Sequence, residues 1–223
     1  MGKSHIGTIK APSDYGFEGF SPPGYGNIRG DEQFQAYLRQ NGWGVSIRNA
    51  IYANADETTC LGGVWDGPTA STPAYFVAEQ TIRQMKEYAD KGNPFFLTCQ
   101  FWGPHQPHLP SREFAGLHDR DAIEPWNNYD DAWAGKPEMI KRVQQDFYRA
   151  RPENWDEWRE VVGLYYDFTA MLDAQIQRIL DRLDELNLRE NTIIVFSTDH
   201  GDMTGSHAGM VDKGYLYEEA HHI

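Results

Sequence analysis

The 223-residue sequence is poor in cysteine, in positive charge and in long apolar runs. Its two cysteines, Cys60 and Cys99, give no disulfide framework and leave the redox compartment open. No apolar run reaches about 18 residues, which argues against a membrane-spanning helix. Lys and Arg number 20 against 33 Asp and Glu, and the formal charge of -13 argues against a nucleic-acid partner. An anionic small molecule is still compatible, because a metal ion and a few Lys or His side chains can create a local positive pocket.

Two apolar runs, 95–101 and 192–198, have the pattern of strands that are covered on both faces of a sheet. Each follows a segment of helical periodicity, 72–91 for the first and 156–187 for the second. A helix, a short turn and a buried strand form the unit from which parallel α/β sheets are built. The sequence therefore predicts an α/β fold with a mostly parallel sheet flanked by helices.

The remaining segments carry weaker signals. Shorter helices are predicted at 31–41, with Asp31 as the N-cap, and near 137–149. Between 43 and 71 we expect a loop with at most a short strand near Val45. Residues 111–155 are polar, aromatic and acidic, and we expect a long insertion there. Above the carboxyl edge of a sheet it would shape substrate specificity, although a solvated surface elaboration explains the composition equally well.

Polar side chains follow both predicted strands. Asp199 and His200 come directly after 192–198, and His105 lies in a proline-rich loop after 95–101. In open α/β sheets, ligands bind just beyond the carboxyl ends of the strands. Asp199 and His200 therefore fit half of a metal site, although a polar turn is an equal alternative. Prolines stiffen the loop around His105, which suits a site for a charged group or simply a rigid surface loop.

Three further candidates lie near the two ends of the chain. Lys3 and His5 are spaced i, i+2 and point the same way if the backbone is extended. Lys213 lies in a glycine-rich stretch that can fold back over the end of 192–198 and offer a positive charge to an oxyanion. Taken singly, each of these residues also fits an ordinary exposed position.

Four motifs, in this order, resemble those of the sulfatase family of the alkaline-phosphatase superfamily. They are Gly2-Lys3-Ser4-His5-Ile6-Gly7, Tyr15-Gly16-Phe17-Glu18-Gly19-Phe20, Pro104-His105-Gln106-Pro107, and Asp199-His200-Gly201 with Asp212-Lys213-Gly214. The resemblance extends over 1–223. It implies an alkaline-phosphatase-like fold in incomplete form, with 1–223 as the central part of a single catalytic domain.

The resemblance implies hydrolysis of a sulfate ester of a small molecule or carbohydrate. It makes Asp199 and His200 ligands of a divalent cation, Ca²⁺ in most members of the family, with Mg²⁺ and Mn²⁺ as alternatives. Lys3 and Lys213 would bind the sulfate group. The metal and the lysines would stabilise charge on the transferring sulfuryl group.

The resemblance also implies roles for two histidines, His105 and His5. His105 would contact sulfate or act as a general acid. His5 would lie beside a formylglycine nucleophile and assist the collapse of its sulfate hemiacetal. In the family, formylglycine forms from Cys or Ser in a Cys/Ser-x-Pro/Ala-x-Arg motif. Neither Cys60 nor Ser71 stands in such a motif, and no aspartate pair precedes Lys3.

We therefore expect the nucleophile, the aspartate pair and a C-terminal subdomain to lie outside these 223 residues, and the chain alone to be inactive. Two other hypotheses stay open. One is a phosphonate or phosphate monoester hydrolase of the same superfamily. The other is a non-catalytic protein that binds an anion.

Overall fold

The computed structural model describes residues 1–4, 10–22 and 28–222, so the candidate residue His5 lies outside the described residues. The helices and strands, in chain order, are α1 (Glu32–Gln40), β1 (Ile47–Tyr52), β2 (Cys60–Trp65), α2 (Pro73–Lys91), α3 (Glu138–Lys141), α4 (Trp155–Glu185), α5 (Ser206–Gly209) and α6 (Glu218–His221). Short 3₁₀ turns occur at Pro12–Tyr15, Ile28–Gly30, Thr69–Ser71, Arg120–Ala122 and Arg189–Asn191, and a π-helical turn at Arg142–Phe147.

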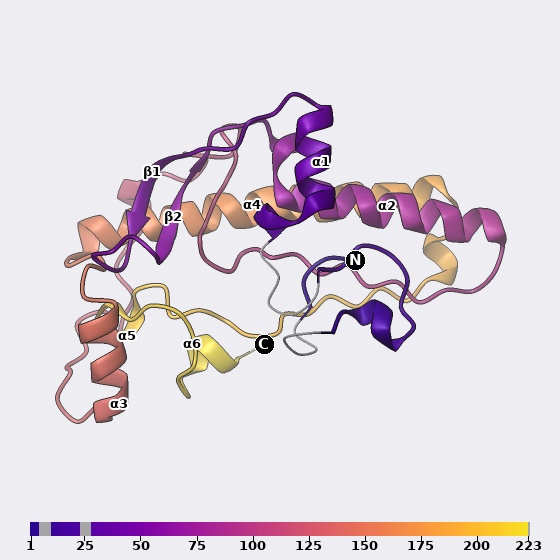
Figure 1. Cartoon of the computed structure of the whole chain (residues 1–223). Helices are drawn as coiled ribbons and strands as arrows, with labels where there is room; N and C mark the ends of the chain where they lie inside the picture. The colour runs from indigo at the N-terminus through magenta and orange to yellow at the C-terminus, as the bar shows by residue number, and fades with distance from the viewer. Residues whose placement is uncertain (5–9, 23–27, 223) are drawn as a thin grey trace.

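The long helices α2 and α4 pack together and cross the molecule, with α1 and the β1–β2 hairpin on one side of them (Figure 1). The strands β1 and β2 are antiparallel. Segment 108–111 lies beside β2 in the parallel direction, through bridges from Gly62 to His108 and from Trp65 to Ser111. Apolar side chains from the helices and from the hairpin side meet in the core. Trp65 of β2, Phe76 of α2 and Leu109 of segment 108–111 form part of one buried cluster. No described helix combines the length and apolarity needed to cross a membrane.

The predicted helices 31–41, 72–91 and 156–187 are confirmed as α1, α2 and α4. The caps are local: the Asp31 carboxylate accepts the N–H of Gln33 at 2.9 Å, and the Thr72 hydroxyl accepts the N–H of Tyr75 at 3.2 Å. Near 137–149 the structure has α3 followed by the π-helical turn. These elements were predictable because their start signals and their apolar spacing are encoded within each segment.

The hairpin β1–β2 is a correction to the loop expected across 43–71. The two glycines in the middle of β2 hide the strand in the sequence, because glycine weakens strand propensity. The packing explains why they are there. A Cβ on Gly63 would lie 2.7 Å from Ile47 Cγ2, and one on Gly62 would lie 3.1 Å from the carbonyl oxygen of His108. The strands on either side of β2 approach too closely to admit side chains.

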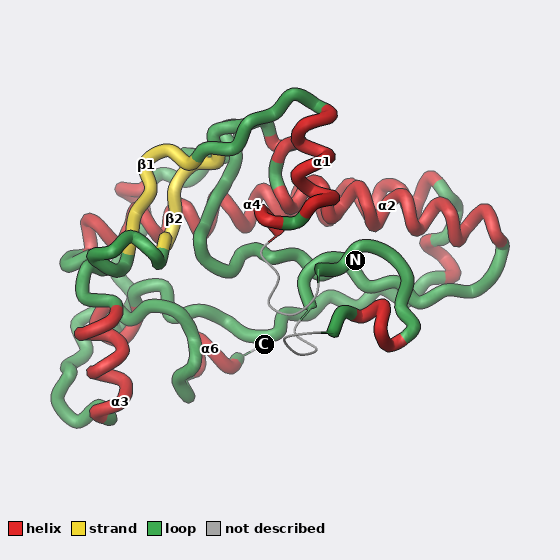
Figure 2. Tube along the Cα trace, viewed as in Figure 1, coloured by secondary structure: helices red, strands yellow, loops and turns green. Residues whose placement is uncertain are grey.

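The segments 95–101 and 192–198 do not form regular strands in the described structure, although buried strands were predicted (Figure 2). A strand needs lateral backbone partners. Segment 95–101 has a few: Gln100 donates to the carbonyl of Met1 at 2.8 Å and accepts from Lys3 at 2.9 Å. Within the described residues, no backbone hydrogen bond joins 193–198 to another segment, and its apolar side chains face solvent.

A buried carboxylate joins the 111–155 segment to α4. Asp167 is fully buried and accepts hydrogen bonds from the backbone N–H groups of Gly116 at 2.7 Å and His118 at 3.0 Å. The Arg120 guanidinium lies 2.7 Å from the same carboxylate, and Nδ1 of His118 lies 2.9 Å from it. Burial opposes ionisation, but the hydrogen bonds from Arg120, His118 and Gly116 outweigh it, so the pKa of Asp167 lies below its usual value. This network holds residues 116–120 against the helix.

Asp167→Asn should lower the free energy of unfolding by about 3 kcal/mol, because it leaves Arg120 without its buried counter-charge. We expect less than about 0.5 kcal/mol for Asp173→Asn, an exposed site on the same helix. The pKa of Asp167 is lower in the folded state than in the unfolded state. Its contribution to the free energy of unfolding is therefore complete above the unfolded pKa of about 3.9, and is lost as the pH falls through the folded pKa. Urea unfolding at pH 7 and pH 3 checks this; equal losses for the two variants at pH 7 would contradict it.

Candidate active site

The side chains of Lys213 and His105, 108 residues apart in sequence, are in contact. Nδ1 of His105 lies 2.7 Å from the carbonyl oxygen of Gln106, and a carbonyl can only accept, so Nδ1 carries the hydrogen. The other ring nitrogen, Nε2, accepts a hydrogen bond from the Lys213 ammonium. The imidazole is therefore neutral in this arrangement. Burial, followed by the charges of Lys213 and Lys3, lowers the pKa of His105.

Lys3 brings a second ammonium group to the same place. Its backbone N–H donates to the carbonyl of Gln100 at 2.9 Å, which places Lys3 beside the end of segment 95–101. Burial and then the charge of Lys213 lower the pKa of Lys3, while Asp199 and Asp212 act in the opposite direction. Two partly buried cations that repel each other favour an anion between them, because the anion neutralises both.

Asp199 and His200 place two atoms that could bind a cation near each other, a carboxylate oxygen and a ring nitrogen. Nδ1 of His200 donates to the carbonyl of Gly201 at 2.7 Å, which leaves a lone pair on Nε2. That nitrogen lies 3.7 Å from Oδ2 of Asp199. Metal-binding histidines commonly donate their other N–H to a backbone carbonyl, so the pair fits two ligands of a cation. Across residues 1–4, 10–22 and 28–222, no group of three or more His, Cys, Asp or Glu gathers to hold a metal.

The pair Asp199–His200 lies next to the pair Lys213–His105, and the two histidines make the contact. The His200 and His105 rings are in edge contact, with centroids 5.9 Å apart. The structure thus brings five of the six predicted site residues into one neighbourhood: Lys3, His105, Asp199, His200 and Lys213. The sixth, His5, is not among the described residues.

Two residues without a predicted role also belong to this neighbourhood. Asp212 Oδ1 lies 3.3 Å from the Lys213 ammonium, and the Tyr148 hydroxyl donates to Asp212 Oδ2 at 3.3 Å. Burial and the charge of Asp212 raise the pKa of Tyr148, which keeps its hydroxyl protonated. Asp212 was detectable as the direct neighbour of Lys213. Tyr148 was not, because nothing local distinguishes it from other aromatic residues of 111–155.

The second histidine of the proline-rich loop has a different position. His108 is fully buried, and its Nδ1 donates to the carbonyl of Pro104 at 2.9 Å. Its backbone N–H donates to Leu61 of β2 at 2.8 Å. His108 therefore closes residues 104–108 into a compact loop and attaches it to the hairpin, with the half-buried His105 within that loop.

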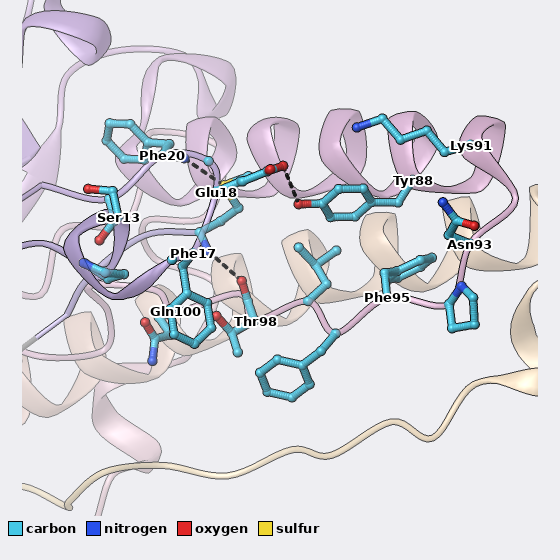
Figure 3. A pocket seen from close by; sticks show the side chains of 18 residues that line it. Ser13, Phe17, Glu18, Phe20, Tyr88, Lys91, Asn93, Phe95, Thr98 and Gln100 are labelled. Carbon is cyan, nitrogen blue, oxygen red and sulfur yellow. Dashed lines mark hydrogen bonds between the residues drawn. The ribbon is translucent and has the colours of Figure 1, made fainter.

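A cavity of about 380 Å³ lies apart from these residues, along 93–98 and the end of α2 (Figure 3). The ring of Tyr88 lies 5.5 Å from that of Phe95, and its hydroxyl donates to Glu18 at 3.3 Å. The only predicted motif that contributes to its lining is the aromatic stretch around Phe17 and Gly19, among the residues the structure describes. None of Lys3, His105, Asp199, His200 or Lys213 lines it.

A family model described as Sulfatase matches residues 2–223. The chain belongs to the sulfatase family. It is 32% identical to iduronate 2-sulfatase of Homo sapiens over 178 residues, which is 74% of this chain and 32% of that protein. It is 31% identical to an arylsulfatase of Clostridium perfringens over 189 residues, which is 84% of this chain and 38% of that protein. The chain thus spans about a third of the length of these curated relatives.

The fold agrees with the family. The structure is similar to phosphonate monoester hydrolase from Silicibacter pomeroyi, with a TM-score of 0.69 and 20% sequence identity. The match covers 87% of this chain and 40% of that one. This likeness confirms the predicted alkaline-phosphatase-like α/β fold in incomplete form.

Lys213→Met should raise the pKa of His105, because it removes a positive charge that lowers this pKa and frees Nε2 to bind a proton. Lys86→Met, on the outer face of α2, is the matched control and should leave the pKa of His105 unchanged. Histidine ring signals followed by NMR across pH 4–9, roughly the range in which imidazole titrates, give the measurement in EDTA-treated protein. A fall, or no change, in the Lys213 variant would refute the contact.

Proposed function

We propose that the protein hydrolyses a sulfate ester of a small molecule or carbohydrate. The observation that carries the proposal is the contact of Lys213 with a neutral His105 beside Lys3. Membership of the sulfatase family supports it, as do relatives that are named sulfatases. The charge pattern supports it as well, because three potential donors to an anion gather in a chain whose net charge is -13.

The residues of this chain would bind the ester and then move a proton. An anionic ester between Lys3 and Lys213 offers its oxygens to both ammonium groups, so Lys213 no longer needs Nε2 of His105 as its acceptor. The negative charge of the ester also raises the pKa of the imidazole. His105 would then carry a proton on Nε2 and deliver it to the departing alcohol oxygen as a general acid. Asp212 would keep Lys213 in place through their ion pair.

Asp199 and His200 would supply two ligands to a divalent cation. Carboxylate oxygen suits Ca²⁺, Mg²⁺ and Mn²⁺, and we propose Ca²⁺ because the family resemblance favours it. A bound cation stabilises negative charge that develops on the ester oxygens. Further ligands and the nucleophile, a formylglycine by the same resemblance, would have to come from other residues of the complete protein, as would any contribution from His5.

The protein that carries this segment at full length should hydrolyse 4-nitrophenyl sulfate faster than 4-nitrophenyl phosphate. Lys213→Ala should lower kcat/KM for the sulfate about 100-fold, since it removes a charge that stabilises the transferring group. Lys86→Ala is the control and should have no effect. Equal or faster turnover of the phosphate would replace this proposal with a phosphate or phosphonate monoester hydrolase. Binding of sulfate without turnover of either ester would favour a non-catalytic anion-binding protein.

Ca²⁺ added to the EDTA-treated full-length protein should raise its melting temperature, because a ligand of the folded state stabilises that state by mass action. Asp199→Asn should abolish most of this shift, since an amide replaces a charged ligand. Asp173→Asn, which is exposed on α4, should keep the full shift. A shift that is the same in all three proteins would show that Ca²⁺ binds elsewhere.

A further inference from the structure

A second recess, of about 300 Å³, lies where three distant segments meet. Its lining comes from 129–133, from 149–153 and from Ala208 and Gly209 at the end of α5. This part of the molecule includes α3 and α5 (Figure 1). A backbone hydrogen bond of 3.1 Å from Ala208 to the carbonyl of Tyr129 joins two of the segments.

One side of the recess presents a fixed guanidinium group. Nη1 of Arg151 donates to the backbone carbonyls of Gln144 at 2.5 Å and Tyr148 at 3.2 Å. The guanidinium carbon lies 5.5 Å from the ring centroid of Trp133. Burial lowers the pKa of Arg151, but arginine keeps its charge in proteins. The remaining N–H groups are therefore held in a set orientation, which reduces the entropy lost when they bind a ligand.

The recess has a net positive charge in an acidic protein. Arg149 is exposed, and no ion pair or hydrogen bond of its side chain is found in the described part of the chain. Two arginines and one carboxylate, that of Glu153, therefore line the recess, and the charges of Asp130 and Glu157 also act on Tyr129. Guanidinium groups bind carboxylate and sulfate through paired N–H donors. The two arginines of the lining favour an anion as the occupant.

Aromatic side chains supply the rest of the wall. Trp133 and Tyr129 are both partly exposed, and Tyr129 is held by edge contact with Trp155 at 5.1 Å between centroids. Aromatic rings of this kind offer apolar area on which the C–H face of a sugar packs. The floor at Gly209 has a φ of 75°, and a Cβ there would lie 3.0 Å from Trp158 Nε1. That buried nitrogen has no hydrogen-bond partner within the described residues.

The recess and the candidate active site share one loop. His200 and Lys213 lie at its two ends, and Gly209 lies between them. We propose that the recess binds an anionic group, a carboxylate or a second sulfate, on a neighbouring sugar of a sulfated carbohydrate whose scissile ester lies between Lys3 and Lys213. This inference rests on the proposed sulfatase activity and narrows its substrate to carbohydrates with at least two anionic groups.

The test compares a two-sugar substrate with a small one in the full-length protein. For a 2-O-sulfated, uronate-containing disaccharide, Arg149→Ala should raise KM about tenfold, as expected for losing one charged hydrogen-bond donor. Turnover of 4-nitrophenyl sulfate should not change, because that ester is too small to reach the recess. Arg142→Ala, an exposed arginine outside the recess, is the matched control and should behave like the unaltered protein.

Binding measured by titration calorimetry separates this inference from the proposed function. If the protein hydrolyses neither compound, the proposed activity fails, and the disaccharide affinity of Arg149→Ala still decides whether the recess binds it. Carboxyl-reduced and desulfated forms of the disaccharide show which anion is bound. Equal affinities of the unaltered protein and Arg149→Ala would overturn the proposal. So would an equal loss in Arg142→Ala, because it would indicate only general attraction between charges.

Discussion

The backbone pairing between β2 and segment 108–111 is the constraint on which the arrangement of the site depends. It uses the N–H of His108 and the carbonyl of Leu61, with a second link from Trp65 to the carbonyl of Pro110 at 2.9 Å. This pairing fixes the end of the proline-rich loop against β2, most of whose residues are buried. His108 then closes the loop onto Pro104, and His105 is left facing the 199–214 segment. The position of the candidate proton donor is therefore determined by a pairing that contains no catalytic residue.

The charges at the candidate site favour the binding of an anion. Burial and then the charge of Lys213 lower the pKa of Lys3, and the imidazole that contacts Lys213 is neutral because a second positive charge there would cost free energy. Asp199 and Asp212 act against this lowering of the pKa of Lys3. In this arrangement, binding of an anion and uptake of a proton by His105 favour each other.

The sequence predicted helices well and strands poorly, for the same physical reason. The N-caps at Asp31 and Thr72 and the apolar face of α4 are short-range features, so they can be read from neighbouring residues. Strand formation depends on partners elsewhere in the chain, which explains both the missed β2 and the unpaired 193–198 segment. Lys3, His105 and Lys213 were found through motif order, whereas Tyr148 reaches Asp212 only through the folded path of 111–155.

The exposed stretch from Ile193 to Phe196 has a consequence for how this chain behaves in solution. The exposed fractions are 92% for Ile193, 49% for Ile194, 83% for Val195 and 83% for Phe196. In the described part of the chain these four apolar residues have no backbone hydrogen bond to another segment, and neither proline nor charge lies among them. They therefore provide a template on which another extended segment can add. The chain on its own would therefore tend to self-associate through this segment. Repulsion between its surplus negative charges would be the main force that opposes this association.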